Sequence, residues 1–256
     1  MNVKAKKHLG QHFLTDENIA RKIVEGLDFQ NYNNVLEVGP GTGVLTKYLL
    51  EMPTETYVAE IDTESIEYLK IHYQKLEDKH FTGDFLKINL SEIFSSQVAV
   101  IGNFPYNISS QILFKIIDNY QQIPEMVGMF QKEVAERTAA VPRTKDYGIL
   151  TVLVQAYYDV KYLFTVHENV FNPPPKVKSG VIKLTRNPKE GLEGNEILFK
   201  QIVKTGFNQR RKKLSNALKP LTIPESLKEH SFMDKRAEEL SVEDFIAFTQ
   251  EWKAAN

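Results

Sequence analysis

The 256-residue sequence predicts an α/β fold: a mostly parallel β-sheet flanked by helices, followed by a small all-helical domain. Three observations support this prediction. Strand-like apolar segments alternate with helix-like segments from the N-terminal region onward. A glycine-rich turn joins the first of these strands to the helix after it, and after about residue 190 only helical patterns remain. We therefore predict one domain over residues 1–188 and a second over residues 189–256.

The elements of the first domain follow one another in a regular order. Asp16 is a typical N-cap residue and precedes apolar residues at helical spacing. The strands expected after this first helix are residues 34–39, 56–62, 80–82, 97–102 and 125–130. The helices expected between and after them are residues 44–51, 63–76, 109–120 (with Ser109 as N-cap) and 132–139.

The pattern changes after Arg143. Residues 147–158 favour a helix, and two strands at 159–166 and 180–186 bracket a proline-rich loop. Two late strands of this kind can pair as an antiparallel hairpin at one edge of a parallel sheet. Residues 187–195 have the composition of a linker, and an apolar helical pattern begins at Ile197.

The composition excludes several classes of protein. The chain has no cysteine, which rules out disulfides, thiol nucleophiles and thiolate metal sites. It has no apolar run of bilayer-spanning length and no signal-peptide pattern, so we expect a soluble, cytoplasmic protein without a membrane partner. No cluster of metal-ligating residues is evident, and we expect no metal.

Positive charge is concentrated in two segments, although the net charge is only −1. The segment from Ile197 to Pro224 contains seven basic residues and no acidic one, and no acidic residue precedes Asp16. Basic segments on an otherwise acidic chain favour binding of a polyanion at one face. A solvated helix face is the alternative interpretation.

The glycine-rich turn carries acidic residues on both sides. In "LEVGPGTGVLT", Gly39, Gly41 and Gly43 follow Glu37, and Glu60 ends the next strand. Glycines at this place allow a ligand to approach the backbone closely, and a carboxylate at the second strand end can accept both ribose hydroxyls. A tight turn alone would also explain the glycines, but together with Glu37 and Glu60 they favour a nucleoside site.

The pattern E-x-G-x-G-x-G resembles the S-adenosylmethionine site of class I methyltransferases, whose Rossmann-like sheet has seven strands. This resemblance implies that Gly39 and Gly41 pass along the amino-acid part of the cofactor. It also implies that Glu60 binds the ribose. Asp84, in "GDF" after the third strand, would meet the adenine amine.

The segment "NFPY" directly follows the fourth strand, where open α/β sheets place their chemistry. An exocyclic amine on a nucleobase is a poor nucleophile because its lone pair is delocalised into the ring. The side-chain carbonyl of Asn103 and the backbone carbonyl of Pro105 can accept its two hydrogens and favour a pyramidal nitrogen. Tyr106 can clamp the base plane, with Phe104 on the cofactor side.

This segment resembles the [DNS]-P-P-[YFW] motif of amino-methyltransferases, in the variant found in ribosomal RNA adenine methyltransferases. Three other segments resemble the same family: "KKHLGQHFLTD", "FNPPPKVKSGV" and "FNQRRKKLSNAL". The resemblance implies that His12 and Leu14 contact the cofactor, that Asn103 does so too, and that Phe171 presents its ring to the target base. It also implies RNA contacts by Arg210, Arg211, Lys212 and Lys213.

Within that family the basic segment resembles the housekeeping (KsgA-type) small-subunit dimethyltransferases. The resemblance implies N6 dimethylation of two adjacent adenosines near the 3′ end of small-subunit ribosomal RNA, in a pre-30S particle, by a monomer. Two alternatives stay open: a large-subunit dimethyltransferase of the macrolide-resistance type, and an RNA-binding assembly factor whose methyl transfer is dispensable. A DNA adenine methyltransferase is disfavoured because no target-recognition domain is visible.

Overall fold

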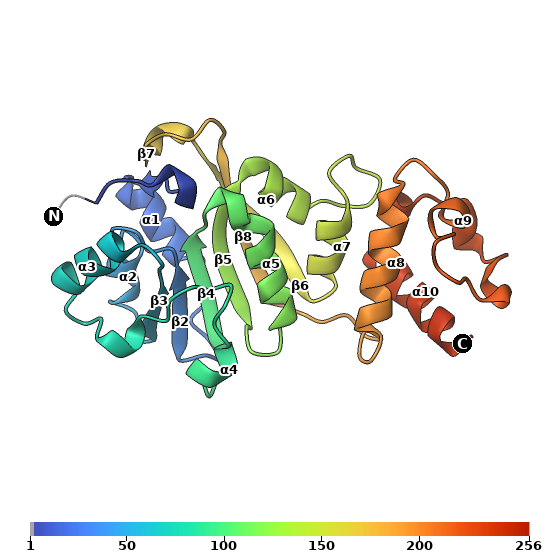
Figure 1. The fold of residues 1–256 in the computed structure, drawn as a ribbon, viewed down its shortest axis with the longest axis horizontal. Coiled ribbons are helices and arrows are strands. Elements are labelled where there is room, and N and C mark those ends of the chain that lie inside the picture. Colours follow the sequence, from blue (N-terminus) through green and yellow to red (C-terminus); the bar gives the residue numbers. More distant parts are fainter. Residues whose placement is uncertain (1–2, 256) are drawn as a thin grey trace. The chain divides into compact units, whose positions relative to one another are not determined.

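The computed structural model describes residues 3–255 and has the predicted α/β architecture. Its main sheet has six strands (Figure 1), which lie in the order β3 (Glu55–Ala59), β2 (Asn34–Val38), β4 (Val98–Asn103), β5 (Glu125–Gln131), β8 (Ser179–Arg186) and β6 (Tyr158–Val166). The first four strands in this order are parallel, and β8 runs antiparallel to β5. Because β2, β3 and β4 are parallel neighbours, the loops that follow them meet at one edge of the sheet.

The strand expected at residues 80–82 is reduced to a single parallel bridge between Phe81 and Val58. A 3₁₀ turn, Asp78–His80, leads directly into Phe81, and Gly83 turns the chain away with a φ of +85°. These two turns leave no room for a longer ladder. The sheet therefore has six full strands where the family resemblance implied seven.

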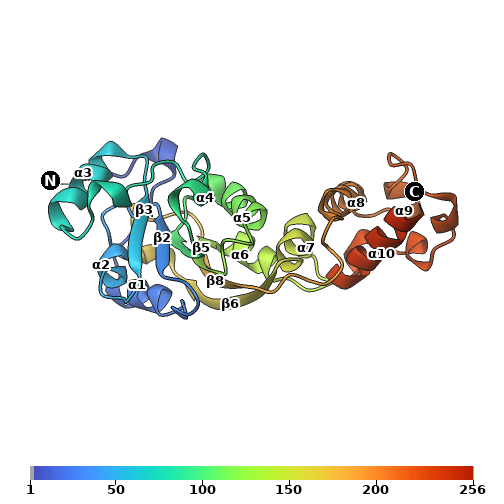
Figure 2. The same ribbon diagram turned by 90° about the horizontal axis from the view of Figure 1, so that it is seen from below.

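Helices cover both faces of the sheet (Figure 2). Helix α1 (Glu17–Val24) and helix α2 (Thr46–Leu49) pack on one face, and α5 (Ser109–Asp118) lies on the other. The Asp16 carboxylate accepts the backbone N–H groups of Asn18 and Ile19, which confirms it as the N-cap of α1. The other helices are α3 (Thr63–His72), α4 (Leu90–Ile93), α6 (Lys132–Thr138), α7 (Ile149–Gln155), α8 (Glu196–Asn208), α9 (Leu214–Ala217) and α10 (Val242–Ala254).

Ser109 is not an N-cap, contrary to the prediction. It is the first residue of α5, and Ile108 occupies the cap position without a side-chain hydrogen bond. The Ser109 hydroxyl donates backward to the backbone carbonyl of Tyr106 at 3.1 Å. A 3₁₀ turn, Tyr106–Ile108, precedes the helix, between the predicted strand at 97–102 and the predicted helix at 109–120.

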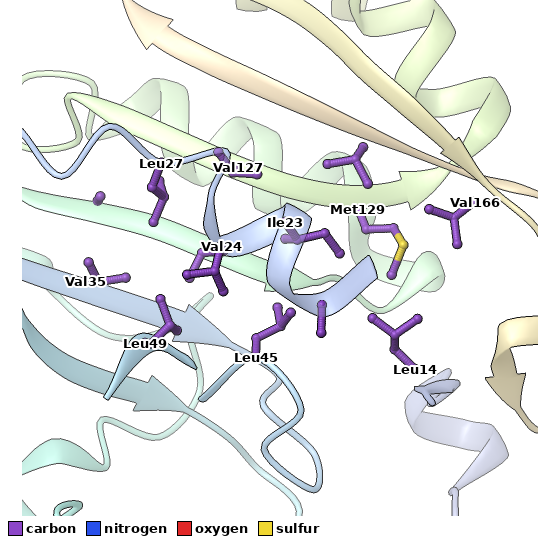
Figure 3. Close-up of a cluster of buried hydrophobic side chains, with 14 of the residues drawn as sticks. Leu14, Ile23, Val24, Leu27, Val35, Leu45, Leu49, Val127, Met129 and Val166 are labelled. Atoms are coloured by element: carbon purple, nitrogen blue, oxygen red, sulfur yellow. The ribbon is translucent and has the colours of Figure 1, made fainter. Parts of the chain in front are cut away.

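The core of the sheet domain lies between α1, α2 and the strands (Figure 3). Ile23 and Val24 of α1 and Leu49 of α2 are fully buried against Val35 and Val127 of the sheet. Such side chains each contribute roughly 1.5–3 kcal/mol on burial. This core supports the strands whose carboxyl ends carry the predicted site.

A separate two-stranded sheet joins two of the quoted sequence motifs. Strand β1 (Phe13–Leu14) pairs antiparallel with β7 (Phe171–Asn172), and Leu14 lies opposite Phe171. The N-terminal motif is thereby fixed beside the proline-rich loop, although about 160 residues separate them in sequence.

The chain divides into two compact units. One comprises the residues up to Glu136 together with Val160–Arg186, and the other comprises Arg137–Asp159 and the residues from Asn187 onward. The predicted second domain, 189–256, lacks the Arg137–Asp159 segment, in which α7 packs against α8. The sequence did not indicate that this segment belongs to the second unit, because in the chain it lies between strands β5 and β6 of the sheet. Among residues 3–255, no helix has the length and apolar character needed to cross a membrane.

Candidate active site

The glycine-rich turn follows β2, and its backbone adopts conformations that residues with a side chain rarely adopt. Gly41 has a φ of +56°, and a Cβ there would lie 2.8 Å from the ring of Phe13. Gly43 has a φ of +81°, and its Cβ would lie 2.4 Å from the ring of Tyr73. Left-handed backbone and close approach both require glycine at these positions. The backbone of the turn therefore lies close to Phe13 of the N-terminal segment.

Glu60 lies at the end of β3 and connects two loops. Its carboxylate accepts the backbone N–H groups of Ile61 at 2.8 Å, Asp62 at 2.9 Å and Gly41 at 3.2 Å. The side chain is 7% exposed, and burial raises its pKa. Oε2 accepts only one of these bonds, so a lone pair remains for a hydroxyl of a ligand. Glu60 lines a cavity together with Gly39, Gly41 and Asn103, which fits the predicted binding of a ribose.

Glu37, inside β2, is the most deeply buried carboxyl group of the site. It is 1% exposed and accepts a hydrogen bond from the Thr46 hydroxyl at 2.6 Å. Burial raises its pKa to about 8, and the nearby Glu60 carboxylate also raises it. Glu37 lines a small cavity with Gly39, Leu14 and Asn103. A carboxyl group in this place suits the cationic end of a ligand, because a positive charge would restore its ionised form.

Asn103 ends β4 with its amide held in one orientation. Its Nδ2 group donates to the backbone carbonyl of His12 at 2.8 Å. That bond fixes the orientation of the amide, and Oδ1 is its only atom that can accept a hydrogen from a ligand. Asn103 lines both the larger cavity, with Glu60, and the smaller one, with Glu37.

The Phe104 ring packs against two glycines of neighbouring strands. Gly102 of β4 pairs with Gly128 of β5, and a Cβ on either would lie within 2.7 Å of the Phe104 ring. The ring is 1% exposed and packs against Phe130 at a centroid distance of 4.9 Å. This packing fixes the backbone between Asn103 and Tyr106.

The two backbone carbonyls of this segment differ. That of Pro105 accepts the Ile108 N–H at 3.2 Å within the 3₁₀ turn, and it also lies 3.4 Å from the Ser109 hydroxyl, which donates to Tyr106 as well. That of Phe104 accepts no hydrogen bond from residues 3–255. Pro105 was the predicted second acceptor, and the structure adds the Phe104 carbonyl as a group with both lone pairs free.

Tyr106 is held at its hydroxyl and on one side of its ring. The hydroxyl lies 2.6 Å from Oγ of Ser179, a fully buried residue at the start of β8. The His12 ring stacks on the Tyr106 ring at 5.5 Å, and His12 Nδ1 donates to the Pro173 carbonyl at 2.8 Å. Burial raises the pKa of Tyr106. Ser179 was not predicted to belong to the site, although it is the serine of the quoted motif "FNPPPKVKSGV".

Phe171, which was predicted to present its ring to the target base, lies in a cluster of buried hydrophobic side chains. It is 4% exposed and belongs to the core with Leu14, its partner across the β1–β7 pair. Its stacking on a base stays a prediction. The Asp84 carboxylate accepts the Leu86 N–H at 3.0 Å and pairs with Lys87, and Asp84 does not line the cavity, so its contact with the adenine amine stays a prediction.

The four predicted RNA-binding residues have different surroundings. Arg210 is half-buried and its guanidinium binds Glu238 and the backbone carbonyls of Thr144 and Lys145. Those bonds use three of its five N–H groups, so its contact with RNA stays a prediction. Lys213 pairs with Asp234 at 2.8 Å, whereas Arg211 and Lys212 are exposed. No group of three or more His, Cys, Asp or Glu side chains in residues 3–255 is arranged to hold a metal ion.

Comparisons with known proteins agree on the family. The family described as "Ribosomal RNA adenine dimethylase" matches residues 2–253. A ribosomal RNA small subunit methyltransferase A from Flavobacterium johnsoniae is 58% identical over 253 residues, which are 98% of this chain and 97% of that protein.

Two solved structures have the same fold. A dimethyladenosine transferase from Plasmodium falciparum superposes with a TM-score of 0.82 at 27% identity, covering 95% of this chain and 98% of the other. The 23S rRNA methyltransferase ErmE superposes with a TM-score of 0.69 at 24% identity, covering 94% and 99%, and shows the fold alone. The sequence relatives and the family match decide the assignment: the chain belongs to the ribosomal RNA adenine dimethylase family.

Proposed function

We propose that this enzyme dimethylates the N6 amines of two adjacent adenosines near the 3′ end of small-subunit ribosomal RNA. The observation that carries the proposal is the fixed orientation of the Asn103 amide at the end of β4. The relative at 58% identity is named for the small subunit, which favours that substrate over the large subunit. We further propose that the enzyme acts as a monomer, in the cytoplasm, on a pre-30S particle.

S-adenosylmethionine is the cofactor, and it supplies an electrophilic methyl group on a sulfonium centre. The Glu60 carboxylate has a lone pair for a ribose hydroxyl, and the glycine turn leaves space for close approach at Gly41. Glu37 lies buried beside the smaller cavity, where its negative charge favours a cationic group. Gly39 and His12 line the larger cavity between these acids and Asn103.

The target amine is activated by hydrogen-bond acceptors. Oδ1 of Asn103 accepts one N6 hydrogen, because Nδ2 is already bonded to His12. A backbone carbonyl of Phe104 or Pro105 accepts the other hydrogen. Two acceptors in these places draw the hydrogens out of the base plane and turn the nitrogen lone pair toward the methyl carbon. The proton can leave after transfer, so orientation accounts for most of the rate.

Tyr106 holds the plane of the extruded adenine. Its ring is fixed by Ser179 at the hydroxyl and by His12 on one side, which leaves the opposite side for the base. Stacking between a base and an aromatic side chain contributes roughly 1–3 kcal/mol. We assign the main stacking role to Tyr106, because Phe171 is 4% exposed in the structure.

Transfer of labelled methyl groups tests this function. Wild-type enzyme and labelled S-adenosylmethionine are incubated with small subunits that lack the modification, and the labelled nucleotides are mapped by nuclease digestion. We expect label on two adjacent adenosines, with two methyl groups each, and almost none with Asn103→Ala. Label on large-subunit RNA, on cytosine or on protein would contradict the proposal.

An RNA-binding assembly factor with dispensable activity is the second candidate. Arg211 and Lys212, both exposed, favour RNA binding under either function. The variant Asn103→Ala, expressed in cells in place of the wild type, distinguishes the two candidate functions. Normal maturation of the small subunit without methylation would favour the assembly role.

A further inference from the structure

The N-terminal segment, residues 6–13, forms one wall of the larger cavity. Its residues 8–13 line that cavity together with Glu60 and Asn103. The end of the segment is held by strand β1, which pairs with β7. Between residues 6 and 12 the backbone forms one 3₁₀ turn, Lys7–Leu9, and no strand. Side-chain bonds therefore hold this earlier part of the segment in place.

Asp62 supplies the bonds that hold the earlier part. Its carboxylate forms an ion pair with the Lys6 ammonium group and accepts a hydrogen bond from Nε2 of Gln11 at 3.0 Å. Oε1 of Gln11 accepts the backbone N–H of Lys6 at 2.8 Å. Both ends of the stretch from Lys6 to Gln11 are therefore attached to one carboxylate.

The Asp62 side chain is fully buried, and helix α3 holds it from the other side. As the N-cap of α3 it accepts the Glu64 backbone N–H at 3.2 Å, and it also accepts the Ser65 hydroxyl at 3.2 Å. Burial acts to raise the pKa of Asp62, but the hydrogen bonds from Lys6 and Gln11 outweigh it and hold the pKa below its usual value. The carboxylate is therefore ionised at neutral pH and fixed in position.

The backbone of Asp62 contacts the carboxylate proposed to bind the ribose. Its N–H donates to Oε1 of Glu60 at 2.9 Å. Asp62 thus contacts Glu60 through its backbone and the N-terminal segment through its side chain. One residue connects two walls of the same cavity.

The stretch held by Asp62 leads directly to the group that orients Asn103. His12 follows Gln11, and its backbone carbonyl accepts a hydrogen bond from Nδ2 of Asn103 at 2.8 Å. Strand β1 holds the backbone after this carbonyl, and the His12 ring is bonded to the Pro173 carbonyl. The Asp62 bonds hold the backbone before it. Loss of these bonds should therefore misplace the carbonyl without releasing the whole segment.

We propose that Asp62 is a positioning residue for methyl transfer: by holding the N-terminal segment, it fixes the backbone carbonyl that orients Asn103. The inference rests on the proposed function, in which Oδ1 of Asn103 accepts a hydrogen of the target amine. Asp62 acts through this chain of bonds and needs no contact with the base. Because methyl transfer depends on orientation, a small shift of the Asn103 amide slows the chemical step.

Asp62→Asn tests the proposal without removing the helix cap, because asparagine caps helices as well as aspartate does. The rate of the first methyl transfer is measured with enzyme in excess over unmethylated small subunits and with saturating cofactor. We expect this rate to fall roughly 5–20-fold. Lys6→Met, which removes the same ion pair, should give a similar loss. Lys6→Arg should retain most of the rate, because it keeps the positive charge.

Asp78→Asn is the matched control. It makes the same chemical change and breaks an exposed ion pair with Lys70, and neither residue lines the cavity. We expect the wild-type rate from this variant. Melting temperatures and cofactor affinities are measured for every variant. A residue that only stabilised the fold would lower the melting temperature, and one that only aided cofactor binding would raise the KM for cofactor.

A wild-type rate at saturating cofactor in both Asp62→Asn and Lys6→Met would overturn the proposal. So would an equal loss in Asp78→Asn, or a loss in Lys6→Arg as large as that in Lys6→Met. Failure of the proposed function is detected separately, because it appears as a wild-type rate in Asn103→Ala. An inactive Asn103→Ala together with fully active Asp62→Asn would refute this inference alone.

Discussion

Replacing Glu37 with glutamine tests whether the buried carboxyl group beneath the glycine turn is protonated in the free protein. Glutamine has nearly the shape of protonated glutamate, and its carbonyl oxygen can still accept the Thr46 hydroxyl hydrogen. It remains neutral at every pH. A difference in stability between the two proteins therefore reports the cost of ionising a buried carboxyl group.

The magnitude follows from the pKa of Glu37, which burial raises from 4.5 to about 8. Between these two values the folded protein binds more protons than the unfolded chain, so its stability falls as pH rises. Relative to pH 4, the loss is about 3 kcal/mol at pH 7 and about 5 kcal/mol at pH 9, at 1.36 kcal/mol per pKa unit. Glu37→Gln abolishes this loss, and its advantage over the wild type should grow across the same window.

The assay is urea unfolding of both proteins without cofactor at pH 5, 7 and 9. Glu51→Gln is the control, because that carboxylate is exposed to water. We expect the difference in unfolding free energy between Glu37→Gln and wild type to increase with pH, and that of the control to remain constant. A pH-independent difference for Glu37→Gln would show that Glu37 is ionised in the free protein and would refute the reasoning. The same variant should bind S-adenosylmethionine more weakly, since it cannot acquire negative charge.

Three other changes give distinct expected results. Ser179→Ala and Tyr106→Phe each remove one partner of the same hydrogen bond, so each variant should lower kcat/KM roughly 5-fold. The double variant should lower kcat/KM no further than either single one, and additive losses in methyl-transfer assays would contradict this coupling. Glu60→Ala removes the ribose acceptor, and calorimetry should show cofactor binding weakened on the order of 10²-fold; unchanged affinity would remove Glu60 from the site. Ile23→Ala leaves a cavity between α1 and the sheet and should lower the unfolding free energy by about 2–5 kcal/mol; a loss under 1 kcal/mol would contradict the packing.

The fold was predictable where local pattern and packing agree. The glycine turn, the acid at Glu60 and the segment from Asn103 to Tyr106 follow strands that are visible as apolar runs. Parallel strands carry their following loops to one edge, which brings these residues together without further information. Residues of all three segments line one cavity.

Side-chain partners across long sequence separations were not predictable. Arg210 was expected to contact RNA because it lies in a basic run, but its partners Thr144 and Lys145 come from a loop more than 60 residues away. The position of a charge in the sequence does not reveal whether the guanidinium forms hydrogen bonds with other parts of the chain. The burial of Phe171 was not predictable for a similar reason, because it depends on the pairing of β7 with β1.

Two smaller differences between prediction and structure arise from neighbouring turns. Ser109 has the chemistry of an N-cap, but the 3₁₀ turn from Tyr106 supplies a carbonyl for its hydroxyl and draws it into the first turn of α5. Phe81 has the character of a strand residue, but turns on both sides restrict it to one bridge. Neither outcome follows from residue preferences, since both depend on the backbone that precedes the residue.

A crystal structure with S-adenosylhomocysteine and an adenosine-containing RNA bound together would examine the activation of the amine most directly. We predict that Oδ1 of Asn103 lies within hydrogen-bond distance of N6, with Nδ2 still bonded to the His12 carbonyl and the base stacked on Tyr106. An adenine whose amine meets neither Asn103 nor a carbonyl of Phe104 or Pro105 would contradict it.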